Sequence, residues 1–263
     1  MSTWKRIPIE SIVPAKILKR ADSFNLEDYV YKSTVRNFNF RWLAPTKRLL
    51  WMAVGQEYIE PELLDWIDQI PRSSNFYDLG ASNGIFAIYA AKRGLRTVAL
   101  EPDPANYFLL SWNTFLNQGT DFHITPLNVA ASDHFGIDNL FIHKMELGTH
   151  EKIVSNPLSV FGENFKPEHI QPIQLVHFDK WIALLGLPKP QYIKIDVDGH
   201  ESSVLHGATE SLRGCNQLFI EIEDSKFCEL NRILTDIGLF MKEKYPVQNY
   251  SGLSNYIYAK TAK

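Results

Sequence analysis

The chain has 263 residues, of which 45% are apolar and 22% are charged, and its net charge is −3. This length fits one large α/β domain, or a domain with a small extension. No run approaches the roughly 18 apolar residues that a membrane span needs, and no signal-peptide pattern opens the chain. Cys215 and Cys228 fit neither a zinc spacing nor a disulfide framework, so we expect a cytoplasmic protein.

Charge is distributed unevenly along the chain. Residues 1–50 carry ten basic and four acidic side chains, a net charge of +6, which leaves −9 for the remainder. The aromatic residues of this basic segment include Tyr29, Tyr31, Phe38, Phe40 and Trp42. Such a segment either faces an anionic acceptor or nucleic acid, or forms a strand-like extension whose aromatic side chains alternate inward. We favour the second interpretation.

Helical and strand patterns alternate from residue 58 onward. Pro61 suits the first turn of a helix, and Asp103 followed by Pro104 is typical of a helix start. Up to residue 130 the patterns predict helices at 60–70, 84–93 and 104–117 and strands at 75–79, 96–100 and 122–130.

Residues 132–190 interrupt this alternation. They contain strand-like pieces at 139–143 and 172–178, and then a helix at 179–186 that Asp179 would cap. The alternation resumes with strands at 191–196, 217–222, 239–244 and 255–260 and with helices at 201–213 and 225–237. This order predicts an α/β fold with a doubly wound, seven-stranded, mostly parallel sheet of the Rossmann-like kind.

The last strand should be antiparallel, because about ten residues separate it from the preceding one and leave no room for a crossover helix. We expect an N-terminal extension at 1–55 and a domain at 56–263. The insert at about 132–190 would then lie above the carboxyl edge of the sheet, where ligands bind.

The turn FYDLGASNGIFA joins a strand directly to a helix, and Glu101 ends the next strand. A glycine-rich turn lets backbone approach a ligand, and the later carboxylate can accept both hydroxyls of a ribose. The G-x-x-x-G spacing lacks the middle glycine of a dinucleotide site. Asp78 would repel a pyrophosphate but attract the ammonium and sulfonium of S-adenosylmethionine (SAM). The sequence therefore favours SAM over NAD, and either ligand over a turn that binds nothing.

The blocks DLGASNG, LEPDPANYFLLSWN, NVAASD, HFDKW, YIKIDVDGHESSVLHGA and FIEIE occur in this order. In them the chain resembles the FkbM family of SAM-dependent methyltransferases, over about residues 56–225. The family usually carries Asn where this chain has Ser82, and Glu where it has Asp198. The resemblance implies a class I methyltransferase fold. It also implies O-methylation of a hydroxyl on a sugar, a glycan or a small natural product, without specifying the acceptor.

The resemblance also assigns contacts to the cofactor. Asp78, Gly80 and Gly84 would line its methionine end, Glu101 would hold the ribose, and the NVAASD block would approach the adenine. A turn or cap role for Asp133, and a helix-start role for Glu60, remain open. The full set of cofactor residues is Glu60, Asp78, Gly80, Ala81, Ser82, Gly84, Glu101, Pro102, Asn128, Ala131, Ser132 and Asp133.

The stretch KIDVDGHE places ionisable side chains where a buried strand ends, which is costly without a purpose. Asp196 and Asp198 could bind Mg²⁺ or Mn²⁺. Alternatively, Asp196 or His200 acts as a base while Lys194 pairs with a neighbouring carboxylate. In a third interpretation the stretch is only a turn, with Glu201 at a helix start and His200 exposed. We favour the second interpretation and expect no metal.

Glu221, in the strand FIEIE, either faces the acceptor pocket or neutralises Lys194, and we favour neutralisation. The catalytic candidates are Lys194, Asp196 and His200. The candidate substrate contacts are Asp198, Glu201 and Glu221.

The leading functional hypothesis is a SAM-dependent O-methyltransferase for a glycan or small molecule. The basic N-terminal segment suggests a nucleic-acid methyltransferase as an alternative, but DVDG stands where such enzymes carry an N/D-P-P-Y type sequence. A SAM-binding protein without turnover is the other alternative, and the complete set of cofactor acids argues against it. The oligomeric state does not follow from the sequence.

Overall fold

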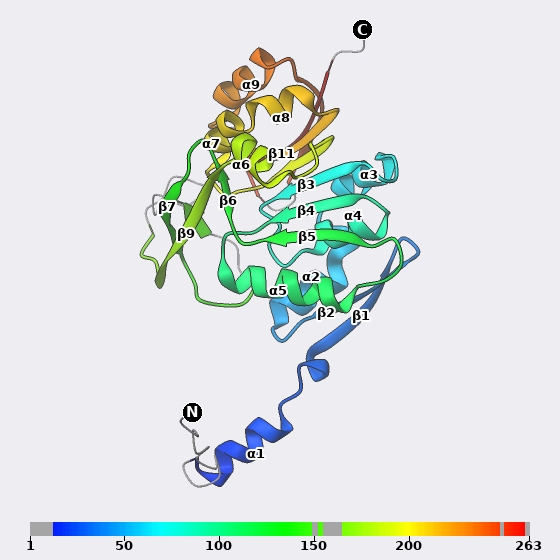
Figure 1. Ribbon diagram of the computed structural model, residues 1–263, viewed down its shortest axis with the longest axis vertical. Coiled ribbons are helices and arrows are strands. Elements are labelled where there is room, and N and C mark those ends of the chain that lie inside the picture. Colours follow the sequence, from blue (N-terminus) through cyan, green and yellow to red (C-terminus); the bar gives the residue numbers. More distant parts are fainter. Residues whose placement is uncertain (1–12, 149–151, 155–164, 248–249, 261–263) are drawn as a thin grey trace, which may run out of the picture.

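A central mixed sheet of seven strands organises the computed structural model, which describes residues 13–148, 152–154, 165–247 and 250–260 (Figure 1). The strand order is β12–β13–β11–β10–β3–β4–β5. The bounds are β3 Asn75–Leu79, β4 Arg96–Leu100, β5 His123–Leu127, β10 Tyr192–Ile195, β11 Gln217–Glu223, β12 Phe240–Pro246 and β13 Leu253–Ala259. The strands predicted at 75–79 and 96–100 are confirmed to the residue.

The direction of the strands divides the sheet into two parts. From β11 through β10, β3 and β4 to β5, all neighbours pair in parallel. β13 runs antiparallel to both β11 and β12, so the sheet is not cleanly parallel. The antiparallel final strand that the short connection predicted is confirmed.

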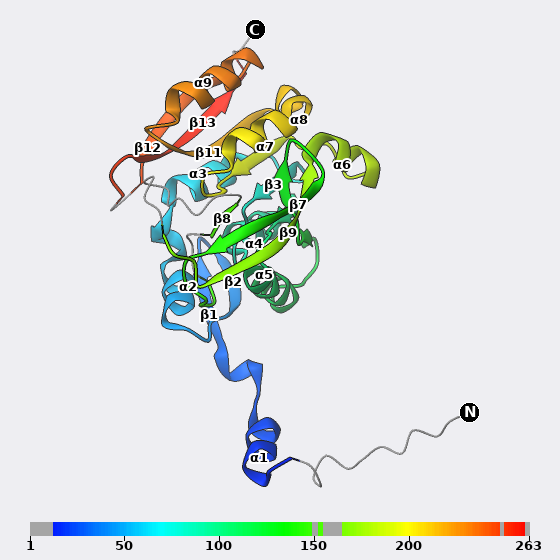
Figure 2. The same cartoon turned by 90° about the vertical axis from the view of Figure 1, so that its left-hand side faces the viewer.

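Helices cover both faces of the sheet (Figures 1 and 2). One face carries α6 Phe178–Leu185, α7 Glu201–Gly207, α8 Thr209–Gly214 and α9 Phe227–Asp236. These helices pack on strand residues such as Tyr77, Ile193 and Leu218. The other face, marked by Phe76 and Phe219, carries α3 Pro61–Gln69 and α4 Ile85–Lys92. Successive strand side chains point to opposite faces, so this alternation decides which side chains share the site.

The N-terminal segment adds a hairpin of β1 Val30–Val35 and β2 Phe38–Leu43, followed by α2 Lys47–Ile59. Thr46 caps α2 by accepting a hydrogen bond from the Leu49 N–H. Phe40 and Trp42 stack on each other and are buried in the core, as the favoured interpretation predicted. Tyr29 and Tyr31, by contrast, are exposed.

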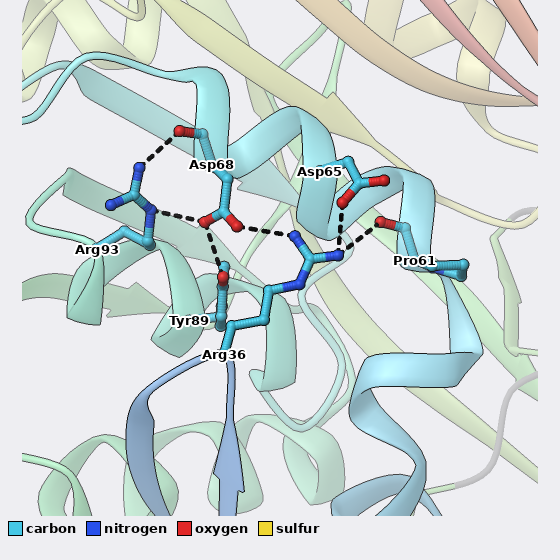
Figure 3. A network of polar contacts seen from close by, with 6 residues as sticks. All are labelled: Arg36, Pro61, Asp65, Asp68, Tyr89 and Arg93. Carbon is cyan, nitrogen blue, oxygen red and sulfur yellow. Dashed lines mark hydrogen bonds and ion pairs between the residues drawn. The ribbon is translucent and has the colours of Figure 1, made fainter.

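The tip of this hairpin is tied to the helices (Figure 3). Arg36 forms ion pairs with Asp65 at 2.6 Å and with Asp68 at 2.8 Å, both on α3. Tyr89 on α4 donates a hydrogen bond to Asp68, and Arg93, directly after α4, pairs with the same carboxylate at 2.7 Å. The hairpin tip, α3 and α4 therefore share one charged network, which fixes the corner between α2 and α3.

The predicted insert contains a second sheet. Its strand order is β6–β9–β7–β8, with β6 Ala130–Ser132, β7 Gly136–Ile142, β8 Lys152–Val154 and β9 His169–His177. Residues 149–151 and 155–164 of the insert, and residues 1–12 of the predicted extension, lie outside the described residues.

The strand predicted at 122–130 is divided between the two sheets. The Asn128 side chain donates hydrogen bonds to the carbonyl oxygens of Glu101 and Pro102, at 2.8 and 3.0 Å. These bonds hold the chain at the point where β5 ends and turns toward β6. A bond to a residue 27 positions away leaves no mark in the local pattern.

The helix predicted at 201–213 is also divided, into α7 and α8. Asp179 was expected to cap its own helix, but no side chain caps α6. Its carboxylate instead accepts hydrogen bonds from the Glu210 and Ser211 N–H groups at the start of α8. Asp179 therefore caps α8, a separate helix, from across a packing interface.

The helix α1, Ala15–Ser23, has no buried residue. It stands away from the body of the molecule in both views and is joined to it through the 3₁₀ turn η2, Leu26–Tyr29 (Figures 1 and 2).

Within the described ranges, no helix combines the length and the apolar character that crossing a bilayer requires. α5, Pro104–Leu116, completes the helices and is capped by Asp103 as predicted.

Candidate functional site

A cavity of about 720 Å³ lies at the carboxyl ends of β3, β4, β10 and β11. This volume is within the range of about 300–1,000 Å³ that is common for small-molecule sites. The glycine-rich turn and Glu101 line one end, the residues that follow β10 line the other, and α2 forms a side wall. The predicted cofactor turn and the predicted acceptor stretch therefore share one cavity.

The close approach of two chain segments explains Gly80. Its φ is +87°, and an added Cβ would lie 1.8 Å from the Asp196 carbonyl oxygen. The glycine is therefore required by the crossing of the turn and the end of β10. Ser82, at φ +49°, also occupies the left-handed region, where Asn is more favourable than Ser.

Glu101 is buried at the end of β4 and holds the turn in place. Its two carboxylate oxygens accept hydrogen bonds from the Ser82 N–H at 2.7 Å and the Asp103 N–H at 2.9 Å. Burial raises the pKa of Glu101 to about 7, and the hydrogen bond from the Asp103 N–H opposes this rise. Each oxygen retains a further lone pair, so the carboxylate can still accept hydrogen bonds from a diol.

Apolar and polar groups share the wall near Glu101. The apolar part is formed by Leu100, Val129, Ala131 and Leu140. The buried side chain of Asn83 also lines the cavity, and its Oδ1 has no hydrogen-bond partner in the described part of the chain. This end therefore suits a ligand that combines an apolar ring with hydrogen-bonding groups.

Strand register assembles an acidic corner at the other end. Asp78 on β3 and Phe219 on β11 both pair with Lys194 on β10, so these side chains lie on the face that carries α3 and α4. Asp196 and Glu221 follow two positions after Lys194 and Phe219 and point to the same face. Both line the cavity.

Lys194 neutralises part of this corner. Its Nζ lies 3.0 Å from Asp78, 3.2 Å from Asp196 and 3.2 Å from the Gly80 carbonyl oxygen. Burial alone would lower the pKa of Lys194, but the charges of Asp78 and Asp196 outweigh it and raise that pKa. Glu221, the partner that we favoured, forms no ion pair with Lys194 among the described residues, and it faces the cavity instead.

Among the acids of the cavity wall, the pKa values of Glu60 and Glu221 rise furthest above the ordinary value. Burial, followed by the charge of Asp196, raises the pKa of Glu60 to about 8. The same two causes raise the pKa of Glu221 to about 10. Glu60 precedes α3 without capping it, so its side chain is available to the cavity. The raised pKa of each carboxyl favours its protonated form, which can donate a hydrogen bond to a ligand.

His200 and Asp198 also line the cavity. His200 was expected to be exposed if the stretch were only a turn, but it is half-buried, and burial lowers its pKa. Asp198 has a φ of +37°. Asp enters the left-handed region more readily than Glu does, so the shorter acid suits this backbone.

Six predicted site residues lie outside the cavity wall. Asp78 is buried behind Lys194, and Gly84 starts α4 at a φ of +88°. Asn128 holds the end of β5, and Ser132 and Asp133 bond to Ser203 on α7. Glu201 accepts a hydrogen bond from the Gly199 N–H and pairs with Lys226 at 3.5 Å. The residues that reach the wall are Glu60, Gly80, Ala81, Ser82, Glu101, Pro102, Ala131, Lys194, Asp196, Asp198, His200 and Glu221.

Three parts of the wall were not predicted. α2 contributes Arg48, Trp51, Met52 and Tyr58, and β8 contributes Lys152, whose ion pair with Asp103 is buried. Val247, Tyr250 and Leu253 come from the connection between β12 and β13 and from the start of β13. The apolar run LLWMAV was a usable signal, because a surface helix normally alternates apolar and polar positions. No group of three or more potential metal ligands occurs within the described ranges.

Comparisons with known proteins agree with this arrangement. The family described as "Methyltransferase FkbM domain" matches residues 78–244. The hexuronic acid methyltransferase AglP of Haloferax volcanii is 26% identical over 157 residues, which are 59% of this chain and 59% of AglP. The chain therefore matches less than two thirds of the length of that relative.

Solved structures share the fold at low sequence identity. Magnesium protoporphyrin IX methyltransferase (ChlM) from Synechocystis PCC 6803, with bound SAM, aligns over 82% of this chain and 85% of its own. The TM-score is 0.50 and the identity 9%. The FkbM methyltransferase of Methylobacillus flagellatus KT covers 70% of this chain and 43% of its own, at 18% identity and a TM-score of 0.48.

The family match covers more than half of the chain and spans the glycine-rich turn, Glu101 and the KIDVDGHE stretch. The resemblance noted in these motifs is thus confirmed. The chain belongs to the FkbM methyltransferase domain family.

Proposed function

We propose that this protein is a SAM-dependent methyltransferase that methylates a hydroxyl group of a sugar. One observation carries this proposal: a glycine-rich turn with Glu101 and an acidic corner with Asp196 open into one cavity. The relative AglP, a hexuronic acid methyltransferase by name, supports a sugar as the class of acceptor.

The residues at the Glu101 end fit SAM. The Glu101 carboxylate would accept hydrogen bonds from the ribose hydroxyls, and Leu100, Val129 and Ala131 would enclose the adenine. Asn83 Oδ1, which is buried without a partner among the described residues, would accept a hydrogen bond from the ligand. The methionine portion would then point along the turn toward Glu60.

When bound, SAM supplies an electrophilic methyl group and carries its own leaving group. The chain has to align the acceptor hydroxyl and accept its proton. Asp196 is the proposed base, because its carboxylate lines the cavity and Lys194 holds one of its oxygens at 3.2 Å. The raised pKa of Glu221 favours its protonated form, so Glu221 is suited to position the acceptor by donating a hydrogen bond.

Substitutions at the two ends of the cavity should separate cofactor binding from transfer. We expect Glu101→Ala to weaken SAM binding by about 1.5–3 kcal/mol, the scale of a hydrogen bond to a charged group. Asp196→Asn should leave SAM affinity within about twofold and reduce methyl transfer by at least 100-fold, the scale of losing a positioned base. Calorimetry and transfer of labelled methyl groups to a panel of sugars measure the two effects.

Glu210→Ala serves as the control, because Glu210 is exposed on α8, far from the cavity wall. Unchanged SAM affinity in Glu101→Ala would refute the placement of the ribose. Full transfer by Asp196→Asn would refute the assigned base, and a protein that binds no SAM would refute the proposed function itself.

A further inference from the structure

The cavity continues outward along an apolar surface of α2. Trp51 and Tyr58 line the cavity, yet they are 58% and 75% exposed. They are seven residues apart and therefore lie on one side of the helix, about 10 Å apart along its axis. Large apolar side chains grouped in the open at the mouth of a cavity commonly mark a ligand-binding surface.

Gly55 lies between these two aromatic residues on the same side of α2. Glycine inside a helix is destabilising relative to alanine. The fold does not require it here, because its φ is not in the left-handed region and an added Cβ would meet only Ile59, at 3.6 Å. The missing side chain leaves a notch between two exposed rings. We call Trp51, Gly55 and Tyr58 the α2 platform.

The chemistry of the α2 platform favours sugar rings over other occupants. Aromatic faces are apolar and carry a partial negative charge, which complements the C–H groups on the faces of a sugar ring. The platform itself has no charged side chain, and the cavity wall beside it carries both acids, such as Asp196 and Asp198, and bases, such as Arg48 and Lys152. A phosphodiester backbone needs a continuous row of basic side chains, which the platform does not offer.

We propose that the α2 platform binds the sugar units next to the methylated one, so that the acceptor is an oligosaccharide rather than a single sugar. This inference rests on the proposed function and extends it. The length of the platform spans two linked rings, and its continuity with the cavity places them beside the unit that reaches Asp196. The platform lies outside residues 78–244, the part of the chain that matches the family.

The test measures how much of the full-length protein is retained on a surface that carries oligosaccharides of one to six sugar units. Both neutral and acidic oligosaccharides are used, in the presence of S-adenosylhomocysteine. We expect retention to rise with length up to three units. Trp51→Ala and Tyr58→Ala should each reduce retention at least tenfold. Phe115→Ala is the matched control, because Phe115 is an aromatic residue that is 60% exposed on α5 and does not line the cavity.

Gly55→Leu is a second variant, and we expect it to affect thermal stability and oligosaccharide retention in opposite directions. Leucine raises the intrinsic stability of the helix, so the melting temperature should hold or rise, while the filled notch should lower retention at least tenfold. This pattern excludes loss of folding as the cause.

Three outcomes would overturn the proposal. One is oligosaccharide retention that does not depend on Trp51 or Gly55, or no retention at all. Another is retention of single-stranded RNA instead of sugars. The third is a dimer, seen by ultracentrifugation, that Trp51→Ala dissociates. In each case SAM binding by calorimetry reports separately on the proposed methyltransferase function.

Discussion

Lys194 brings a positive charge into the acidic end of the cavity. Its side chain is 3% exposed and that of Asp78 is 1% exposed, so their ion pair is shielded from solvent. Removing one partner of a buried pair leaves the other charge without compensation, and this loss usually exceeds the net value of the pair. The lysine thus stabilises the two carboxylates that flank it and aligns one of them for catalysis.

Lys194→Met should therefore lower the free energy of unfolding by about 3–5 kcal/mol. Arg213→Met is the control, because the ion pair of Arg213 with Glu210 is exposed at both ends, at 54% and 72%. Its loss should cost about 1 kcal/mol or less, as for a pair near the surface. Urea unfolding measures both, and equal costs would show that the burial of Lys194 does not set its contribution.

The sequence predicted many of these residues but not their neighbours. Lys194, Asp196 and Glu221 were recognised because acids and a lysine at strand ends are unusual. Strand register decides which of these side chains form ion pairs, and no local pattern reveals that register. The favoured pairing of Glu221 with Lys194 was therefore wrong. The positions of Asn128 and Asp179 likewise depend on hydrogen bonds to distant segments.

At the scale of elements, the crossing of the glycine-rich turn and the end of β10 joins the two halves of the cavity. The Asp196 N–H also donates a hydrogen bond to the Leu79 carbonyl oxygen, at 3.0 Å. A side chain at Gly80 would push these segments apart, because the nearest atoms belong to backbone. The cofactor turn and the acceptor loop therefore keep a fixed separation.

Gly80→Ala should destabilise the fold by several kcal/mol, and clearly more than Gly186→Ala. Both glycines have positive φ, at +87° and +62°, but nothing lies within 4 Å of a Cβ added at Gly186. Gly186→Ala therefore measures only the cost of a left-handed backbone conformation, roughly 1–2 kcal/mol. Any further loss of stability in Gly80→Ala measures the cost of separating the two crossing segments. Thermal unfolding measures the loss of stability in each variant, and equal losses would contradict this account.

Element prediction succeeded where local signals are strong. β3 and β4 were located to the residue because a buried apolar run stops at a glycine turn or at an acid. α2 was missed because its apolar positions surround the helix instead of forming one stripe. The reason is functional in our account, since one side of α2 packs on the core and another faces the cavity and its mouth.

At the scale of the whole molecule, the buried acids make stability depend on pH. The ordinary pKa of Glu60, Glu101 and Glu221 is 4.5, and the folded values are raised to about 8, 7 and 10. The folded chain therefore binds more protons than the unfolded chain above pH 4.5. Their stabilising contribution is complete below pH 4.5 and decreases as pH rises through the folded values.

We expect the free energy of unfolding to decrease from pH 5 to pH 8, measured by urea unfolding at each pH. Glu101→Gln should flatten the decrease between pH 5 and 7, because glutamine does not titrate, and Glu221→Gln should flatten it over the whole range. Glu210→Gln, at an exposed site, is the control. Stability that rises over this range would contradict the raised pKa values.

The pairing of β3 with β10 has a consequence for how the molecule folds. Lys194 contacts the Gly80 carbonyl oxygen although 114 positions separate them in the chain. Long-range pairings of this kind form late, because the entropy of closing the loop is lost before the contacts are gained. We therefore expect the floor of the cavity to be unformed in the transition state of folding. A ligand of this cavity would therefore slow the unfolding of the finished protein without speeding its folding.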